Sequence, residues 1–172
     1  MDVLAPLDLV DGAARVYDPI VRGEAGEDTQ TVALADLLGA VAEDARRAGA
    51  EVEVEVSPGL TASLRPLAFK RALTNLAGNA AAHGEHVRLS ARPLPSGGLE
   101  IEVEDDGPGI PEAMYEDAFR PFSRLDESRN QNRKGVGLGL AIARDVARGH
   151  GGDVTLGRSD LGGLKADIRL PG

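Results

Sequence analysis

Cysteine and tryptophan are absent from the 172-residue chain, and aromatic residues of all kinds make up only 3% of it. Without cysteine there are no disulfides, thiolate metal ligands or cysteine nucleophiles, which fits a reducing compartment. The core must be aliphatic, and aliphatic side chains would also hold a flat ligand. No apolar run is long enough for a transmembrane helix or a secretory signal, so we expect a cytoplasmic location.

Basic residues are also scarce, because 19 Lys and Arg face 28 Asp and Glu, for a net charge of −9. This balance argues against nucleic acid and anionic membranes as partners, since both select basic surfaces. Any anionic ligand must therefore find a local basic patch. The stretch 120–134 offers one, with Arg120, Arg124, Arg129, Arg133 and Lys134.

The length supports one full core, which we place in residues 31–172. In residues 1–30, apolar side chains recur at alternating spacings of three and four, but prolines interrupt the pattern. This pattern favours a short helix followed by a linker, and a disordered end remains the alternative.

From residue 31 the apolar periodicity predicts alternating helices and strands. Helices are expected over 33–47, 65–83, 111–118 and 138–148, and strands over 51–56, 60–64, 86–92, 99–105, 153–156 and 165–170. The order lacks strict βαβ repetition. It therefore predicts an α/β fold, a two-layer sandwich with a mixed sheet and about three helices on one face.

Asp105 is a carboxylate at a position where the pattern calls for an apolar side chain. Apolar and acidic residues alternate over 99–105, so Asp105 shares the inner face of the strand with Ile101 and Val103. A carboxylate taken out of water needs hydrogen-bond donors. The glycine turn 106–109 follows at once and lets backbone approach a ligand closely. A donor group on a ligand is the simplest partner for Asp105.

The long helix carries a polar stripe in which Asn75, Asn79 and His83 recur every four residues. Asparagine is a poor helix former, so two of them in mid-helix call for a reason. One is a solvated face. The other is that Asn79 offers its side-chain oxygen to a hard cation such as Mg²⁺.

A glycine-rich run from Gly135 to Leu140 leads into the last helix, whose free N–H groups suit a phosphate. The spacing fits neither a dinucleotide fingerprint nor a P-loop, and close helix packing would also explain the glycines. The adjacent basic loop favours the phosphate. Phe119 and Phe122 at its base either anchor such a loop or simply pack in the core.

In this order, the motifs resemble the catalytic and ATP-binding domain of sensor histidine kinases, which belongs to the Bergerat-fold superfamily. The match covers residues 31–172 and is most similar to the osmosensor EnvZ type. Residues 75–79 resemble the N box, 105–109 and 135–140 the two glycine boxes, and 119–122 the F box.

The resemblance implies an ATP site in which Asp105 accepts a hydrogen bond from the adenine amino group, Asn79 holds Mg²⁺ and Asn75 supports the phosphates. Asn75, Asn79 and Arg129 are its implied catalytic residues. Further implied nucleotide contacts are His83, Gly107, Gly109, Ile110, Phe122, Arg133, Lys134, Gly135, Val136, Gly137, Leu138, Gly139 and Leu140. The partners it implies are a histidine phosphoacceptor and dimerisation domain and a response regulator. The isolated domain would be a monomer, and a full-length kinase a dimer anchored in the membrane.

The chain departs from the family pattern in two places. Ala82 and His83 replace a basic residue and a tyrosine common in relatives, and none of the three histidines precedes an acidic residue as the phosphoacceptor does. The chain should therefore need a separate phosphoacceptor. Two other functions remain open. One is an ATPase of the gyrase or MutL type, disfavoured because Asn75 replaces the water-activating glutamate, and the other is a nucleotide-binding module without kinase activity.

Overall fold

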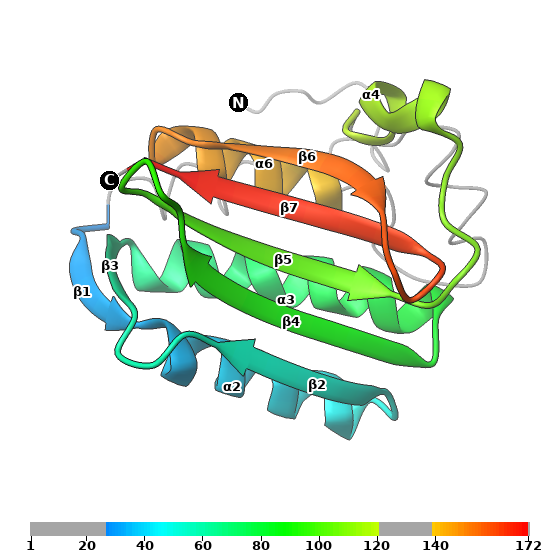
Figure 1. Cartoon of the computed structure of the whole chain (residues 1–172), viewed down its shortest axis with the longest axis horizontal. Coiled ribbons are helices and arrows are strands. Elements are labelled where there is room, and N and C mark those ends of the chain that lie inside the picture. Colours follow the sequence, from blue (N-terminus) through cyan, green and yellow to red (C-terminus); the bar gives the residue numbers. More distant parts are fainter. Residues whose placement is uncertain (1–26, 121–138, 172) are drawn as a thin grey trace, which may run out of the picture.

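Five strands form the main sheet, in the order β2-β4-β5-β7-β6 (Figure 1). The computed structural model describes residues 27–120 and 139–171. Its elements are β1 (Gln30–Ala33), α2 (Leu34–Arg47), β2 (Glu51–Val56), β3 (Thr61–Leu64), α3 (Pro66–His83), β4 (His86–Pro93), β5 (Leu99–Asp105), the 3-10 helix η2 (Glu112–Met114), α4 (Tyr115–Ala118), α6 (Gly139–Gly149), β6 (Asp153–Arg158) and β7 (Leu164–Leu170). The β2–β4 pair is parallel and the other pairs of this sheet are antiparallel, so the sheet is mixed as predicted.

Three helices, α2, α3 and α6, lie on one face of the sheet (Figure 1), which confirms the predicted two-layer α/β sandwich. The predicted apolar stripe of α2 is buried, and so is that of α3 around Phe69 and Leu73. These side chains meet Ile101 and Val103 of β5 in one core. No helix among the described residues is both long enough and apolar enough to cross a bilayer.

Two local predictions were wrong. Residues 30–33 form β1, which pairs with β3 in a separate two-stranded sheet, so the first helix begins at Leu34 and not at Ala33. The helix predicted over 111–118 is instead η2 followed by the single turn α4. The exposed side chains of η2 offer no apolar face to pack, so nothing sustains an α-helix there.

The outer face of β5 is buried as well, although the alternation predicted a half-buried strand. Glu100, Glu102 and Glu104 are all buried. Basic side chains from β4 and β7 cover them: Arg88 lies 3.1 Å from Glu104, and Arg92 lies 2.7 Å from Glu100. Since β5 lies between β4 and β7, ion pairs with side chains of these neighbouring strands enclose its acidic side within the described part of the chain.

The predicted domain boundary at residue 30 stays a prediction. Residues 1–26 lie outside the described part of the chain. Residues 27–29 belong to the predicted linker, and Glu27 accepts hydrogen bonds from the backbone N–H groups of Leu67 and Ala68 at the start of α3.

Candidate functional site

Asp105 lies at the end of β5, is only 2% exposed and pairs across the sheet with Val87 of the core, so its predicted inward orientation is confirmed. Its Oδ1 accepts hydrogen bonds from the backbone N–H of Gly107, at 2.8 Å, and of Leu164, at 3.2 Å. The expectation that a ligand is the simplest donor therefore needs correction, because the protein backbone already supplies two. These bonds fix the carboxylate at the C-terminal end of β5, the central strand of the sheet.

Two glycines make this close packing possible. A Cβ at Gly163 would overlap Asp105 Oδ1 and lie 2.6 Å from the Asp105 carbonyl oxygen, and a Cβ at Gly107 would overlap the carbonyl oxygen of His83. The turn then passes Gly109, whose φ of +72° suits glycine. Ile110 follows and packs against the core. The carboxylate is thus held between two glycine-containing segments.

Asp106 has a different role from its neighbour. Its Oδ1 accepts hydrogen bonds from the backbone N–H groups of Glu85, at 2.8 Å, and His86, at 3.1 Å. Its Oδ2 lies 2.6 Å from Nδ1 of His86. The hydrogen bond to Asp106 raises the pKa of His86, and the bonds from His86 lower the pKa of Asp106. Asp106 therefore fastens the loop after β5 to the turn that follows α3, a role that the sequence did not indicate.

The structure brings three of the predicted motifs together around α3. Asn75, Asn79 and His83 lie in this helix, all partly buried. The C-terminal end of α3 meets the glycine turn, since Gly107 packs against the His83 carbonyl. Nearer the middle of α3, a Cβ on Gly139 of α6 would lie 3.6 Å from the Asn75 carbonyl oxygen, which is an ordinary van der Waals contact. The start of α6 therefore adjoins the asparagine stripe.

Several predicted residues lie outside the described part of the chain. These are Phe122, Arg129, Arg133, Lys134, Gly135, Val136, Gly137 and Leu138. Of the described neighbours, Phe119 and Leu140 are buried and belong to the core. The proposed nucleotide contacts of all these residues stay predictions.

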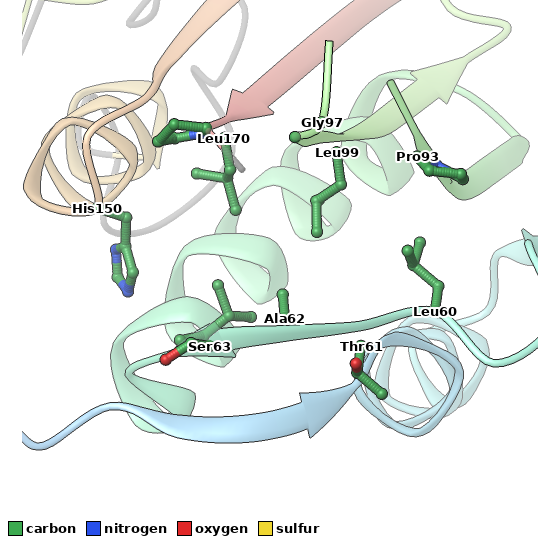
Figure 2. A pocket seen from close by; sticks show the side chains of 12 residues that line it. Leu60, Thr61, Ala62, Ser63, Pro93, Gly97, Leu99, His150 and Leu170 are labelled. Carbon is green, nitrogen blue, oxygen red and sulfur yellow. The ribbon is translucent and has the colours of Figure 1, made fainter. Parts of the chain in front are cut away.

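A hollow of about 470 Å³ lies at the opposite end of the main sheet (Figure 2). Leu60 of the β2–β3 turn and Leu99 of β5 point toward each other across it, and His150 lies at its side. Leu99 and Asp105 are the two ends of β5, so about 20 Å separates this hollow from the carboxylate. It is therefore distinct from the site around Asp105.

Glu100, Glu102 and Asp167 form the one acidic group with metal-ligand spacing among the described residues. Arg169 lies 3.2 Å from Glu100, and Lys165 lies 3.7 Å from Glu102. Because basic side chains already pair with the two glutamates, the group is part of the ion-pair cover of β5.

Comparison with known proteins points to one family. Residues 64–172 match the family described as "Histidine kinase-, DNA gyrase B-, and HSP90-like ATPase". The sensor histidine kinase GtrS of Pseudomonas aeruginosa is 45% identical over 107 residues, which are 62% of this chain and 22% of GtrS. The sensor-type histidine kinase PrrB of Mycobacterium tuberculosis is 31% identical over 176 residues, covering 99% of this chain and 39% of PrrB.

The fold matches the crystal structure of the ATP binding domain of the same PrrB. The TM-score is 0.68 at 34% identity, and the match covers 85% of this chain and 98% of that domain. The chain thus spans less than half the length of GtrS and of PrrB, but nearly the whole of the ATP binding domain of PrrB.

Proposed function

Because the chain belongs to the histidine kinase-, DNA gyrase B-, and HSP90-like ATPase family, we propose that it binds ATP beside Asp105 and presents the γ-phosphate to a histidine of another domain. Within the family it is the catalytic domain of the sensor histidine kinase type, as in PrrB. We also propose the transfer of the phosphoryl group to a histidine, the partner domains that this transfer needs, and a likeness to kinases of the EnvZ type.

The buried carboxylate of Asp105 carries the proposal. Its Oδ1 is held by two backbone N–H groups, so the side chain is fixed before any ligand arrives. A fixed, buried acceptor suits the exocyclic amino group of adenine, because a charge-assisted hydrogen bond is strong in a dry pocket. The glycines on either side let a flat ring approach closely, and Ile110 offers it an aliphatic contact.

The residues of α3 fit a metal-bound triphosphate. Asn79 supplies an amide oxygen of the kind that Mg²⁺ binds, and Asn75 lies one turn away beside the start of α6. In this arrangement Asn79 would hold Mg²⁺, which neutralises charge on the phosphates. The backbone N–H groups at the start of α6 would bind phosphate oxygens. Arg129, Arg133 and Lys134 would complete the phosphate contacts.

We infer that the phosphoryl acceptor lies on another domain, because none of the three histidines of this chain precedes an acidic residue. His86 is engaged by Asp106, and His150 accepts a hydrogen bond from the Arg65 backbone N–H while its Nδ1 contacts the Val146 carbonyl. These contacts assign both histidines structural roles. The partners are therefore a dimerisation and phosphoacceptor domain and then a response regulator, in the cytoplasmic part of a membrane-anchored kinase.

A chimera tests the transfer step directly. The dimerisation and phosphoacceptor domain of PrrB, fused ahead of this chain, should become labelled by γ-³²P-ATP on histidine, giving an acid-labile and base-stable product. Asn79→Ala in the same chimera should remove the label by removing the Mg²⁺ ligand. A chimera that binds ATP but acquires no label would contradict the kinase proposal and favour a nucleotide-binding module.

A further inference from the structure

Ser159 attaches the β6–β7 turn, residues 159–163, to the outer face of the sheet. The Ser159 hydroxyl donates a hydrogen bond to Oε1 of Glu104, at 2.9 Å, and accepts one from the backbone N–H of Leu161, at 3.0 Å. Both side chains are buried, since Ser159 is 6% exposed and Glu104 is 3% exposed. One hydroxyl therefore shapes the turn and also joins it to β5.

Glu104 is itself held firmly in place. Its Oε1 accepts a hydrogen bond from Nη2 of Arg88, at 3.1 Å, and its Oε2 accepts from Nε and Nη2 of the same arginine, at 3.2 and 3.1 Å. The Arg88 side chain is only 22% exposed. A charge-assisted fork of this kind fixes direction as well as distance. The carboxylate that receives the Ser159 hydroxyl is therefore a rigid anchor on β5.

The other end of the same turn lies on the inner face of β5. The N–H of Gly163 donates to the Asp105 carbonyl oxygen, at 3.0 Å, and the N–H of Leu164 donates to Asp105 Oδ1, at 3.2 Å. The Ser159 N–H donates to the Gly163 carbonyl oxygen, at 2.8 Å, so the two ends of the turn are bonded to each other. Glu104 and Asp105 are consecutive residues of a strand and point to opposite faces. The turn thus holds the end of β5 from both faces.

We propose that Ser159 is a positioning residue for adenine binding, which acts through the β6–β7 turn on Asp105 and does not contact the ligand. The inference rests on the proposed function, because Asp105 is the residue assigned to adenine. Without the Ser159 hydroxyl, the turn loses its anchor on the outer face and can move away from β5. The Leu164 donor then moves with it, and the Asp105 carboxylate can rotate. Because only molecules with a correctly oriented carboxylate bind tightly, the apparent Kd rises as their fraction falls.

Ser90 supplies a matched control. It is also a buried serine, 8% exposed, and it lies in β4 opposite Glu102 on the same outer face of the sheet. The hydrogen bonds that the structure describes for the β6–β7 turn do not involve Ser90. Ser90→Ala therefore removes the same group from the same face and leaves the anchor of the turn intact.

The test measures the Kd of a non-hydrolysable ATP analogue with Mg²⁺ by calorimetry, at a temperature where every variant is folded. Ser159→Ala should raise this Kd about three- to tenfold, the scale of one ordinary hydrogen bond, whereas Ser90→Ala should leave it unchanged. Ser159→Thr keeps the hydroxyl and should bind like the wild type. Ser159→Cys, whose thiol is a weak donor, should give an intermediate Kd and replaces Ser159→Ala if that variant does not fold.

A double variant shows whether the effect passes through Asp105. In the Asp105→Asn background, Ser159→Ala should cause little further loss of affinity, because the charged acceptor that the turn positions is already gone. An effect of Ser159 on other parts of the site would instead multiply with that of Asp105→Asn.

The outcomes separate the two proposals. A wild-type Kd for folded Ser159→Ala or Ser159→Cys would overturn the role of Ser159 alone. So would a Kd for Ser159→Thr as high as that of Ser159→Ala, or full additivity with Asp105→Asn. Wild-type affinity of Asp105→Asn would overturn the adenine contact, and this inference with it. A wild-type chain that does not bind the analogue would overturn the proposed function as a whole.

Discussion

The backbone of Gly163 lies in direct contact with Asp105. Its N–H donates to the Asp105 carbonyl oxygen at 3.0 Å, and the next residue, Leu164, donates to the carboxylate. The contact leaves no room for a methyl group, because a Cβ at this position would lie 2.6 Å from the Gly107 nitrogen. The orientation of the carboxylate thus depends on the absence of a side chain in the β6–β7 turn.

Gly163→Ala should therefore destabilise the domain and weaken nucleotide binding together. Overpacking of this kind costs about 1 to 3 kcal/mol of unfolding free energy, measurable by urea denaturation. Gly157→Ala in β6 is the control, since its Cβ would make only an ordinary 3.7 Å contact with Lys165. Equal stability of the two variants would show that the turn can yield and that Gly163 does not fix Asp105.

The sequence was sufficient to predict that Asp105 faces inward, because a period of two places it beside Ile101 and Val103. It was not sufficient to predict the Leu164 N–H as a donor, since that contact joins residues far apart in the chain. The role of Asp106 was missed for the same reason. From the sequence alone, Asp105 and Asp106 are two adjacent acidic residues before a glycine. Nothing in that pattern indicates that Asp106 is the one that binds the turn after α3.

At the scale of elements, α3 begins without a capping side chain of its own. Arg65 occupies the N-cap position, Pro66 is the first helical residue, and the first turn contains no acidic residue. The carboxylate of Glu27 fills this role from outside the helix, accepting the N–H groups of Leu67 at 2.9 Å and of Ala68 at 3.2 Å. Since α3 carries Asn75 and Asn79, Glu27 secures the helix on which the proposed phosphate contacts stand.

Glu27→Ala should lower the unfolding free energy by about 0.5 to 2 kcal/mol, the range for loss of an N-terminal cap. Glu27→Gln should cost less, because an amide keeps one of the two acceptors. Urea denaturation measures both variants, with Asp28→Ala as the control at the next, exposed position. An effect of Asp28→Ala as large as that of Glu27→Ala would indicate a general charge effect and contradict capping.

Long periodic elements were predictable, whereas the short elements β1, η2 and α4 were not. The strand 99–105 was predicted with its exact bounds, and the stripes of α2 and α3 were confirmed. The four-residue β1 was missed because its stability comes from pairing with β3 and not from its own pattern. Likewise, the burial of the glutamates in β5 depends on which strands flank it.

At the scale of the whole molecule, the ion pairs on the outer face of the sheet bring carboxylates into close contact. Asp167 of β7 is buried opposite Glu102, next to Glu100. Burial, together with the hydrogen bond and charge of Glu100, raises the pKa of Asp167 to about 7. Although burial acts to raise it, the pKa of Glu100 is lowered by its hydrogen bond with Asp167 and by Arg92 and Arg169. Below a pH of about 7, Asp167 therefore carries a proton, and Glu100 beside it stays ionised.

This arrangement predicts that stability falls as pH rises between about 4 and 7. The folded state holds a proton on Asp167 that the unfolded chain, with an ordinary pKa of 3.8, releases earlier, so the unfolding free energy should drop by on the order of 1 kcal/mol or more. The lowered pKa of Glu100 acts in the opposite sense and only below its ordinary value of 4.5. Urea denaturation at pH 5 and pH 7.5 measures the change.

Asp167→Asn isolates that effect, because the neutral amide cannot titrate. His86 has a raised pKa and also loses stabilisation as pH rises, but it is present in both proteins. The variant should therefore show a smaller loss of stability from pH 5 to pH 7.5 than the wild type. An equal loss of unfolding free energy in the two proteins would contradict the raised pKa of Asp167.

The central claim is that Asp105 recognises adenine, and calorimetric titration of a non-hydrolysable ATP analogue with Mg²⁺ into wild type and Asp105→Asn tests it most directly. Asparagine keeps an oxygen for the Gly107 and Leu164 N–H groups, so the fold should survive while the charged acceptor is lost. The account predicts a loss of about 1.5 to 3 kcal/mol in binding, or roughly ten- to more than a hundred-fold in Kd. A folded Asp105→Asn protein with wild-type affinity would contradict it.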